Sequence, residues 1–316
     1  MLATRPTSKL QRFLPVVSVA FAAWLAAGCA ASHTTIVKPS GAPVQLQTAT
    51  KPELIARYNQ QAEAVTSLNV TVTMTLTAGS AYTGVIKQYH EVKGFILAQK
   101  PSSIRVIGQA PVVGTNIFDM VSDGETFRIS IPSQNKFLTG PANLERPSAK
   151  PIENLRPQHL TSAIFWDAIP EKSPVLVEEA TEASTRYYIL TVIRREVKAG
   201  ADQADVDWEI AQKIWFDRAD LSVARCQIYE PGGKPVSDAS YSGWNAFGAV
   251  RYPRQIALTR PGNDYKLQIG ITKAAFNETI SPDRFVLRQP PGAELVNVGE
   301  ESQQGKPAEP KTEPRN

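Results

Sequence analysis

Leu68-Asn-Val-Thr-Val-Thr-Met-Thr-Leu-Thr77 is the stretch of this sequence that decides the fold. Apolar and polar residues alternate along it, so its five apolar side chains fall on one side of an extended chain and its asparagine and threonines on the other. The pattern predicts a β-strand with one buried and one solvent-facing side. Such a strand needs neighbouring strands or helices to cover its apolar side.

Further strand candidates follow, on both sides of a proline-rich interruption at Pro141–Pro151. Turn residues such as Ser122-Asp-Gly-Glu125 separate them. No connection in the first run is long enough for a crossover helix, so we expect an antiparallel meander of about eleven strands. The candidates after the first span residues 85–98, 103–109, 116–121, 126–131, 136–138, 174–178, 186–197, 206–216, 221–229, 254–260 and 265–273.

Two helices are expected, one before the strands and one between their two runs. Thr50–Glu53 has the residues of a capping box, and an apolar stripe at helical spacing follows it and ends near Ser67. The second helix starts at Arg156–Pro157 and carries an apolar face over Leu160–Ala168. We therefore expect a mainly β (α+β) fold, a single half-open antiparallel β-barrel of about eleven strands with an N-terminal helix and an inserted lid helix.

The start of the chain has the features of an export signal. Arg5, Lys9 and Arg12 come before an apolar run of about 16 residues, short of the roughly 20 that a membrane-spanning helix needs. Leu25-Ala-Ala-Gly-Cys29 ends that run and resembles the lipobox of bacterial lipoproteins, which implies cleavage before Cys29 and a diacylglyceride on it. Ala31, which is not aspartate, implies by the same resemblance an outer-membrane location. An ordinary secretory signal with an incidental cysteine is the alternative.

Composition divides the chain into four parts. The residues after Cys29 contain Ser, Thr, Pro, Gly and Ala without an apolar period, and those after Val298 are mostly Glu, Gln, Lys and Pro. We expect a lipoprotein signal peptide at 1–28, a flexible tether with acylated Cys29 at 29–49, one half-barrel domain at 50–298, and a disordered tail at 299–316.

The charge of the chain argues against a nucleic-acid-binding protein, and its cysteine content argues against a fold held by disulfides. Three of the 34 Lys and Arg lie before Cys29, so 31 remain against 30 Asp and Glu, and no basic run offers a nucleic-acid-binding surface. Once Cys29 carries lipid, Cys226 has no partner for a disulfide. Its alternating context predicts a buried structural thiol.

No catalytic or cofactor-binding motif is present in the sequence. His33, His90 and His159 have no ligand spacing to one another, and the acidic residues within Asp205–Glu209 alternate as on the solvent-facing side of a strand. We expect no enzymatic activity, no catalytic residue, no metal and no cofactor, with the lipid on Cys29 as the one bound group.

Two segments carry a family resemblance. Arg105-Val-Ile-Gly-Gln-Ala-Pro-Val-Val-Gly-Thr115 lies between two predicted strands, and Tyr252–Leu258 is followed by Lys266–Ile271 as a closing strand pair. With the order of tether, helix, strands, inserted helix and strands, they resemble the LolA/LolB superfamily of lipoprotein-handling proteins, and most of all its outer-membrane acceptor. In that family an apolar residue of the corresponding loop protrudes and helps to place lipoproteins in the membrane. The resemblance implies a membrane-insertion loop at Pro111, Val112, Val113, Gly114 and Thr115, with two valines in place of one leucine. A loop packed on the lid helix is the alternative.

The resemblance also implies a function. We expect a monomeric lipoprotein, anchored in the outer membrane with its domain facing the periplasm, that binds acyl chains of lipoproteins or lipids and helps to receive or insert them. A soluble periplasmic carrier is the expected donor. The alternative is a structural or envelope-stress-sensing lipoprotein of the same fold that binds a protein partner. Candidate cavity residues, each alternatively plain core, are Val72, Met74, Leu76, Phe95, Ile104, Leu160, Ile164 and Trp166.

Overall fold

The structure, a computed structural model, describes residues 45–79, 86–110, 114–142, 156–197 and 206–298. Every described helix and strand belongs to one compact unit, Leu46–Asn316. The signal peptide, Cys29, most of the tether and the tail lie outside the described residues, so the four-part division of the chain stays a prediction. None of the described helices is long and apolar enough to cross a membrane.

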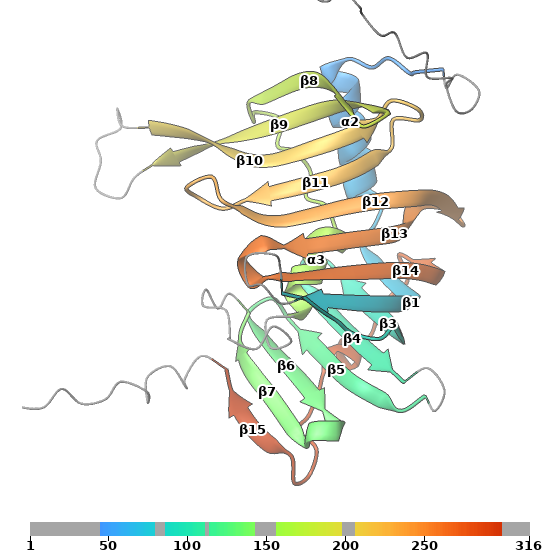
Figure 1. Cartoon of the computed structure of the whole chain (residues 1–316), viewed down its shortest axis with the longest axis vertical. Helices are drawn as coiled ribbons and strands as arrows, with labels where there is room; N and C mark the ends of the chain where they lie inside the picture. Colours follow the sequence, from blue (N-terminus) through green and yellow to red (C-terminus); the bar gives the residue numbers. More distant parts are fainter. Residues whose placement is uncertain (1–44, 80–85, 111–113, 143–155, 198–205, 299–316) are drawn as a thin grey trace, which may run out of the picture. The chain divides into compact units, whose positions relative to one another are not determined.

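One sheet organises the described part of the chain, where it contains fifteen strands. Their order is β15-β7-β6-β5-β4-β3-β1-β14-β13-β12-β11-β10-β9-β8, and β2 pairs with β1 beside that path (Figure 1). The bounds are β1 Ser67–Ala78, β2 Lys87–Gln88, β3 Val92–Gln99, β4 Ser103–Gln109, β5 Asn116–Ser122, β6 Thr126–Ile131, β7 Lys136–Pro141, β8 Val175–Glu182, β9 Thr185–Val197, β10 Val206–Asp217, β11 Val223–Tyr229, β12 Pro235–Phe247, β13 Val250–Arg260, β14 Tyr265–Phe276 and β15 Glu294–Asn297.

The strand predicted from the alternating stretch is β1, in the middle of the sheet. It pairs antiparallel with β14 on one side and with β3 on the other. Its five apolar side chains are all buried, while the threonines between them are partly exposed on the opposite side. The prediction of a strand with one buried side is confirmed, and β1 joins the first run of strands to the last strand of the second run.

The sheet is mixed and open, which corrects the expected antiparallel barrel. β15 pairs with β7 in parallel, with Leu295 opposite Phe137. β15 and β8 are the two ends of the strand order and do not pair with each other. The long connection from Phe276 to Glu294 allows this parallel return, because a parallel pair needs a connection much longer than a hairpin. The mainly β class is confirmed, whereas the expected half-open antiparallel barrel of about eleven strands is corrected to an open sheet of fifteen described strands with one parallel pair.

β12 is the longest strand that the sequence pattern did not predict. Its buried positions include Ser237, Ala239 and Tyr241, which alternate with more exposed residues but lack the β-branched composition typical of strands. β12 is held between β11 and β13, which supply the backbone partners that its own composition does not favour. The predicted strand over 85–98 is likewise divided, into β2 and β3.

Two α-helices are described, α2 at Lys51–Glu63 and α3 at Pro157–Ile164. The capping box before α2 is confirmed, because Glu53 Oε2 accepts hydrogen bonds from Thr50 N at 2.7 Å and Thr50 Oγ1 at 2.8 Å. These bonds lower the pKa of Glu53. Both helices are shorter than predicted, since β1 begins at Ser67 and the chain is extended from Phe165 on. Short 3-10 turns lie at Pro132–Gln134 (η3), Pro261–Asn263 (η5) and Pro282–Phe285 (η6).

α2 packs on the half of the sheet formed by the second run of strands, as Figure 1 shows. Tyr58 is fully buried, and its hydroxyl accepts a hydrogen bond from Gln212 Nε2 of β10 at 2.7 Å. Gln61 Nε2 donates to the carbonyl of Arg251 at 2.9 Å. The helix is therefore tied to the sheet by polar contacts as well as by its apolar face.

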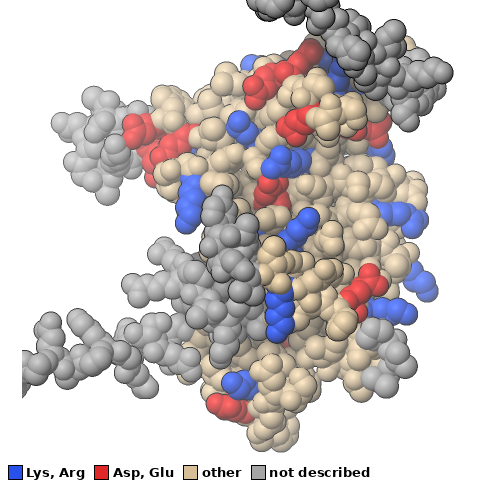
Figure 2. All heavy atoms as spheres, in the orientation of Figure 1, with Lys and Arg blue, Asp and Glu red and all other residues tan. Residues whose placement is uncertain are grey.

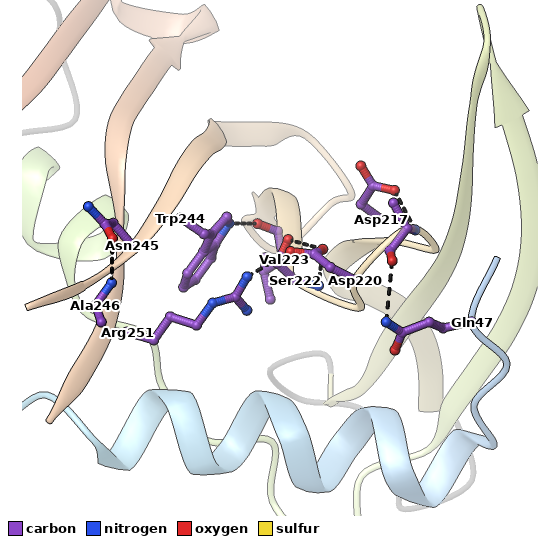
Figure 3. Close-up of polar contacts among 10 residues, drawn as sticks. Gln47, Asp217, Asp220, Ser222, Val223, Trp244, Asn245, Ala246 and Arg251 are labelled. Atoms are coloured by element: carbon purple, nitrogen blue, oxygen red, sulfur yellow. Dashed lines mark hydrogen bonds and ion pairs between the residues drawn. The ribbon is translucent and has the colours of Figure 1, made fainter. Parts of the chain in front are cut away.

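Polar contacts fix the turn between β10 and β11 beside this helix (Figure 3). Gln47 Nε2 donates to the carbonyl of Ala219 at 3.3 Å, and Asp220 pairs with Arg251 Nη2 at 2.7 Å. Trp244 Nε1 donates to the carbonyl of Val223 at 3.0 Å. These bonds join the segment before α2 and the strand β13 to the turn, and the strand β12 to the first residue of β11.

Charged side chains of both signs are interspersed on the face drawn in Figure 2. Arg225 and Asp238 pair across β11 and β12 at 2.5 Å, and Arg105 and Asp119 pair across β4 and β5 at 2.7 Å. The mixture agrees with the near-neutral charge of the chain after residue 28.

Candidate functional site

An apolar cavity of about 180 Å³ lies between the buried side of the sheet and α3. Side chains of β1, β3, β4, β5, β6, β7, β14 and α3 line it. The apolar lining residues are Met74, Leu76, Tyr89, Val92, Val106, Ile117, Phe118, Met120, Ile129, Ile131, Leu138, Leu160 and Leu267.

The strand register explains why these side chains converge. Leu76 lies opposite Leu267 in the pair β1–β14, and Met120 lies opposite Ile129 in the pair β5–β6. Directly opposed residues in a sheet point to the same side, so the apolar sides of neighbouring strands form one surface. Leu160 of α3, which has no exposed surface, faces that surface and completes the lining.

The cavity has the size of a small apolar ligand. An engineered apolar cavity of about 150 Å³ stays dry and binds benzene, so a space of this volume and lining takes apolar groups rather than water. Met74 and Met120 belong to the lining. Methionine side chains are unbranched and adapt their shape to the groups they contact.

One side of the cavity reaches the protein surface. His90, Ser133 and Gln134 are exposed and also line the cavity. They belong to the segment before β3 and to η3. The cavity therefore borders on solvent at this side.

The structure places the eight predicted cavity residues in three groups. Those that line the cavity are Met74, Leu76 and Leu160. Those that are buried in the surrounding core without lining it are Val72, Ile104, Ile164 and Trp166.

Phe95 is the exception, because it lies on the opposite side of the sheet and is 42% exposed. Its neighbour Ile96 in β3 is 1% exposed, and successive side chains of a strand point to opposite sides. The sequence Phe95-Ile-Leu97 is apolar throughout, so its pattern alone did not reveal which side is buried.

Sequence reasoning missed most of the lining from β4 to β7 and β14. Val106, Ile129 and Leu267 occupy buried positions of strands whose residues alternate, so the alternation that selected Met74 was a signal for them. Met120 lies in β5, where four consecutive residues are buried and no alternation pointed to it. The sequence also did not show which strands lie beneath α3.

The C-terminal end of α3 is held by side chains from other elements. Tyr241 OH donates to the carbonyl of Ala163 at 3.1 Å, and Tyr252 OH donates to the carbonyl of Ile164 at 2.8 Å. Lys100 Nζ donates to the carbonyl of Trp166 at 3.1 Å. Burial raises the pKa of both tyrosines, which keeps them protonated as donors. These bonds satisfy backbone carbonyls at a buried helix end and fix α3 above the cavity.

His159 of α3 lies beside the cavity, with its Nδ1 at 2.8 Å from Tyr265 OH of β14. Burial and, to a smaller extent, the charges of Arg260 and Arg156 lower the pKa of His159 to about 2. The imidazole is therefore neutral at physiological pH, and it links α3 to the sheet.

This neutral histidine predicts a loss of stability in acid. The unfolded chain protonates His159 near its ordinary pKa of about 6.5, so below that pH the unfolded state binds more protons than the native state. The free energy of unfolding therefore falls as the pH drops below about 6.5. For His159→Asn we expect the loss in unfolding free energy between pH 7 and pH 5 to be smaller than in the wild type by about 1 to 2 kcal/mol.

Urea unfolding at the two pH values measures this difference. His90→Asn, at an exposed histidine, is the matched control and should keep the wild-type difference. A His159→Asn variant whose acid loss equals that of the wild type would show that another group controls the pH dependence.

Cys226 does not contribute reactive chemistry. Its side chain is buried, and Gln212 Nε2 lies 2.9 Å from its Sγ. Burial raises the pKa of the thiol to about 12, so the nucleophilic thiolate is not formed at neutral pH. Within the described ranges, no three His, Cys, Asp or Glu side chains are grouped to hold a metal ion.

The predicted membrane-insertion loop is described in part. Gly114 has a φ of 65° and donates from its N to the carbonyl of Ala110 at 3.0 Å, while Ala110 N donates to the carbonyl of Thr115 at 2.9 Å. These bonds form a hairpin between β4 and β5, and both Gly114 and Thr115 are exposed. Pro111, Val112 and Val113 lie outside the described residues.

No protein-family model and no curated protein sequence matches the chain. Its structure is similar to that of a LolA superfamily protein from Nitrosomonas europaea, with 10% identity, a TM-score of 0.44, and coverage of 76% of this chain and 99% of that one. It is similar to a DUF1329 family protein from Desulfovibrio piger, with 13% identity, a TM-score of 0.46, and coverage of 74% and 94%. It is also similar to a domain named for outer membrane lipoprotein sorting from Vibrio parahaemolyticus, with 12% identity, a TM-score of 0.42, and coverage of 73% and 94%.

Proposed function

We propose that the chain is a lipoprotein of the bacterial cell envelope that binds acyl chains of lipoproteins or lipids in the cavity beneath α3. The observation that supports this most is the cavity itself, which is lined by apolar side chains and has exposed residues at one side. The acyl chain of the ligand is held by apolar contact, without covalent chemistry.

The energetics of this uptake follow from the lining. Each CH₂ group that moves from water into an apolar site contributes about 0.8 kcal/mol. A ligand that leaves part of its chain in solvent has fewer CH₂ groups in the cavity, so its release costs less free energy. Binding and release therefore both remain possible, as a receiving and transfer protein requires.

Native mass spectrometry tests the proposal on the chain from residue 30 on, purified from cells without added lipid. We expect a population with a bound fatty acid or lipid, and saturable binding of a fluorescent fatty acid. A protein that carries no lipid and binds no fatty acid would contradict the proposal. If the chain carries no lipid but captures a protein partner, the result would instead favour the stress-sensing alternative.

We further propose that Cys29 carries the anchor and that the domain works at the outer membrane. Cys29→Ser is expected to remove the membrane-bound, lipidated form of the protein, because a lipid anchor needs the thiol. Mass spectrometry of the N-terminal peptide and fractionation of inner and outer membranes measure this. A Cys29→Ser protein that is still cleaved and still membrane-bound would exclude the lipobox interpretation.

The loop between β4 and β5 gives a separate prediction about transfer. Replacing both Val112 and Val113 with Glu is expected to slow delivery of cargo to vesicles by about fivefold or more, because a carboxylate is costly in the bilayer. Binding of fatty acid is expected to stay unchanged, because the role proposed for the two valines is in transfer and not in holding the acyl chain. Val286→Glu, at a valine that is 50% exposed elsewhere, is the control. Unchanged delivery would contradict a role of the two valines in membrane insertion and would favour the alternative, a loop packed on the lid helix.

A further inference from the structure

Arg156 is a buried cation that forms no ion pair with a carboxylate of the described residues. It is 1% exposed, it precedes the first residue of α3, and its guanidinium carbon lies 5.1 Å from the centre of the Phe127 ring. Its Nε and Nη1 have no hydrogen-bond partner within the described part of the chain. A buried guanidinium with open donors is costly to maintain, so this position is suited to bind an anion.

The groups around Arg156 add positive charge and neutral donors. Arg260 is partly buried, and its charge acts with that of Arg156 on both His159 and Tyr265. Arg260 Nε donates to Asn263 Oδ1 at 3.4 Å, and the negative charge of Glu230 acts on Arg260. His159 is neutral, and Tyr265 is protonated because burial raises its pKa. The cluster thus contains two guanidiniums, while the Tyr265 hydroxyl is bonded to His159 Nδ1 at 2.8 Å, and no described carboxylate is paired with Arg156.

This cluster lies next to the apolar cavity. Leu160, which lines the cavity, follows Arg156 by four positions at the start of α3 and so lies one helical turn away. Along their strands, Phe127 and Tyr265 are each two positions from a lining residue, Ile129 and Leu267, on the same side of the sheet. Two positions along a strand are about 7 Å apart. The cluster residues do not line the cavity themselves, so the end group of a molecule bound there has to extend past Leu160, Ile129 or Leu267 to meet them.

We propose that Arg156, with Arg260, binds the oxyanion of an amphiphilic ligand, a carboxylate or phosphate group attached to the acyl chain that occupies the cavity. This inference rests on the proposed function and specifies the ligand class of the same site. Arginine presents paired donors that match the two oxygens of a carboxylate or phosphate. The guanidiniums select acyl chains with an anionic end over neutral ones, and the ring of Phe127 holds the guanidinium of Arg156 in place.

The test compares palmitate, hexadecyl phosphate and 1-hexadecanol on the chain from residue 30 on, whose folded unit is described above. The three probes share the chain and differ in the anionic group. We expect both anions to bind about tenfold or more tightly than the alcohol. Equal affinities for all three would overturn the inference while leaving acyl binding intact. If none of the three binds, it is the proposed function that fails.

Arg156→Met removes the charge but keeps an apolar side chain in the buried position. We expect the affinity for palmitate to fall to that for hexadecanol, with hexadecanol binding unchanged. The thermal midpoint of the ligand-free variant should be equal to or higher than that of the wild type, because an unpaired buried charge is lost. Unchanged palmitate affinity would overturn the inference. If Arg156→Met does not fold, Arg260→Met is measured in the same way, with the same expected loss of preference and the same contrary result.

Two further experiments test whether Arg156 instead binds a free anion or a carboxylate of this chain. Inorganic phosphate at millimolar concentration should not displace palmitate, and displacement would assign the site to a free anion. Glu145 and Glu153 are the carboxylates of residues 143–155, the stretch before Arg156 that lies outside the described residues. Replacing both with Gln should leave palmitate affinity unchanged, since neither carboxylate is needed for the ligand. A gain in affinity in that variant would assign Arg156 to a carboxylate of this chain and overturn the inference.

Discussion

Replacing Leu160 with tryptophan is expected to abolish most of the acyl-chain binding while leaving the protein folded. Leu160 projects from α3 into a cavity of about 180 Å³, so there is room for the larger side chain in the space that the ligand needs. Displacing two CH₂ groups of the ligand costs about 1.6 kcal/mol, which lowers affinity by more than about tenfold. Titration with a fluorescent fatty acid measures the change.

Leu160→Ala is the matched variant, because it changes the same position in the opposite direction. It is expected to lower the free energy of unfolding by about 2 to 5 kcal/mol, as for other buried leucines, and to keep or increase fatty-acid binding. Leu160→Trp is therefore expected to lose binding and stay folded, whereas Leu160→Ala is expected to lose stability and keep its binding. If Leu160→Trp binds fatty acid as tightly as the wild type, the ligand does not occupy this cavity.

Replacing Trp166 with alanine is expected to cause the largest loss of stability, about 3 to 5 kcal/mol in the free energy of unfolding. Trp166 is 5% exposed, its ring is stacked on Tyr58 of α2 at 5.7 Å, and it meets Tyr241 of β12 edge-on at 5.1 Å. Its Nε1 also donates to Tyr241 OH at 3.0 Å. One side chain thus joins α2, the segment after α3 and the second run of strands.

Denaturant unfolding of Trp166→Ala, with Trp166→Phe as the control, separates ring packing from the hydrogen bond. The phenylalanine variant keeps an aromatic ring and should lose clearly less stability than the alanine variant. Because α3 is also held through Tyr252 and Lys100, the alanine variant should still fold in the absence of denaturant. A loss below about 1 kcal/mol would contradict the role of Trp166 as the joint between these elements.

Local sequence patterns were sufficient where the chain alternates or caps itself. The strand β1 has one apolar side and one polar side that carries its threonines, and such a pattern is typical only of a half-buried strand. The capping box at Thr50 likewise acts within four residues. Both features depend on neighbours in the sequence, so no tertiary information was needed to predict them.

Features that depend on distant partners were not predicted. β12 has a composition that does not favour strands, and its partners in β11 and β13 determine its conformation. β15 is four residues long and gains its backbone bonds from β7, which lies more than 150 positions earlier. Tertiary pairing overrides local propensity in both cases.

The candidate site was predictable only in part for the same reason. Met74, Leu76 and Leu160 followed from apolar faces, but the sequence did not show that β5, β6 and β7 turn toward the same helix. Arg156 was treated as the start of a helix, and its burial against Phe127 depends on a contact between two distant segments. The sequence shows which side chains are apolar or charged, but it does not show which residues surround them.

Photo-crosslinking with a fatty acid that carries a diazirine near the end of its chain tests the central claim most directly. Peptide mass spectrometry then identifies the residues that the ligand contacts. The proposal predicts labels on the cavity lining, at Met74, Met120, Leu160 or Leu267, and their loss in Leu160→Trp. Labels confined to the opposite side of the sheet, at exposed residues such as Phe95 or Leu176, would contradict it.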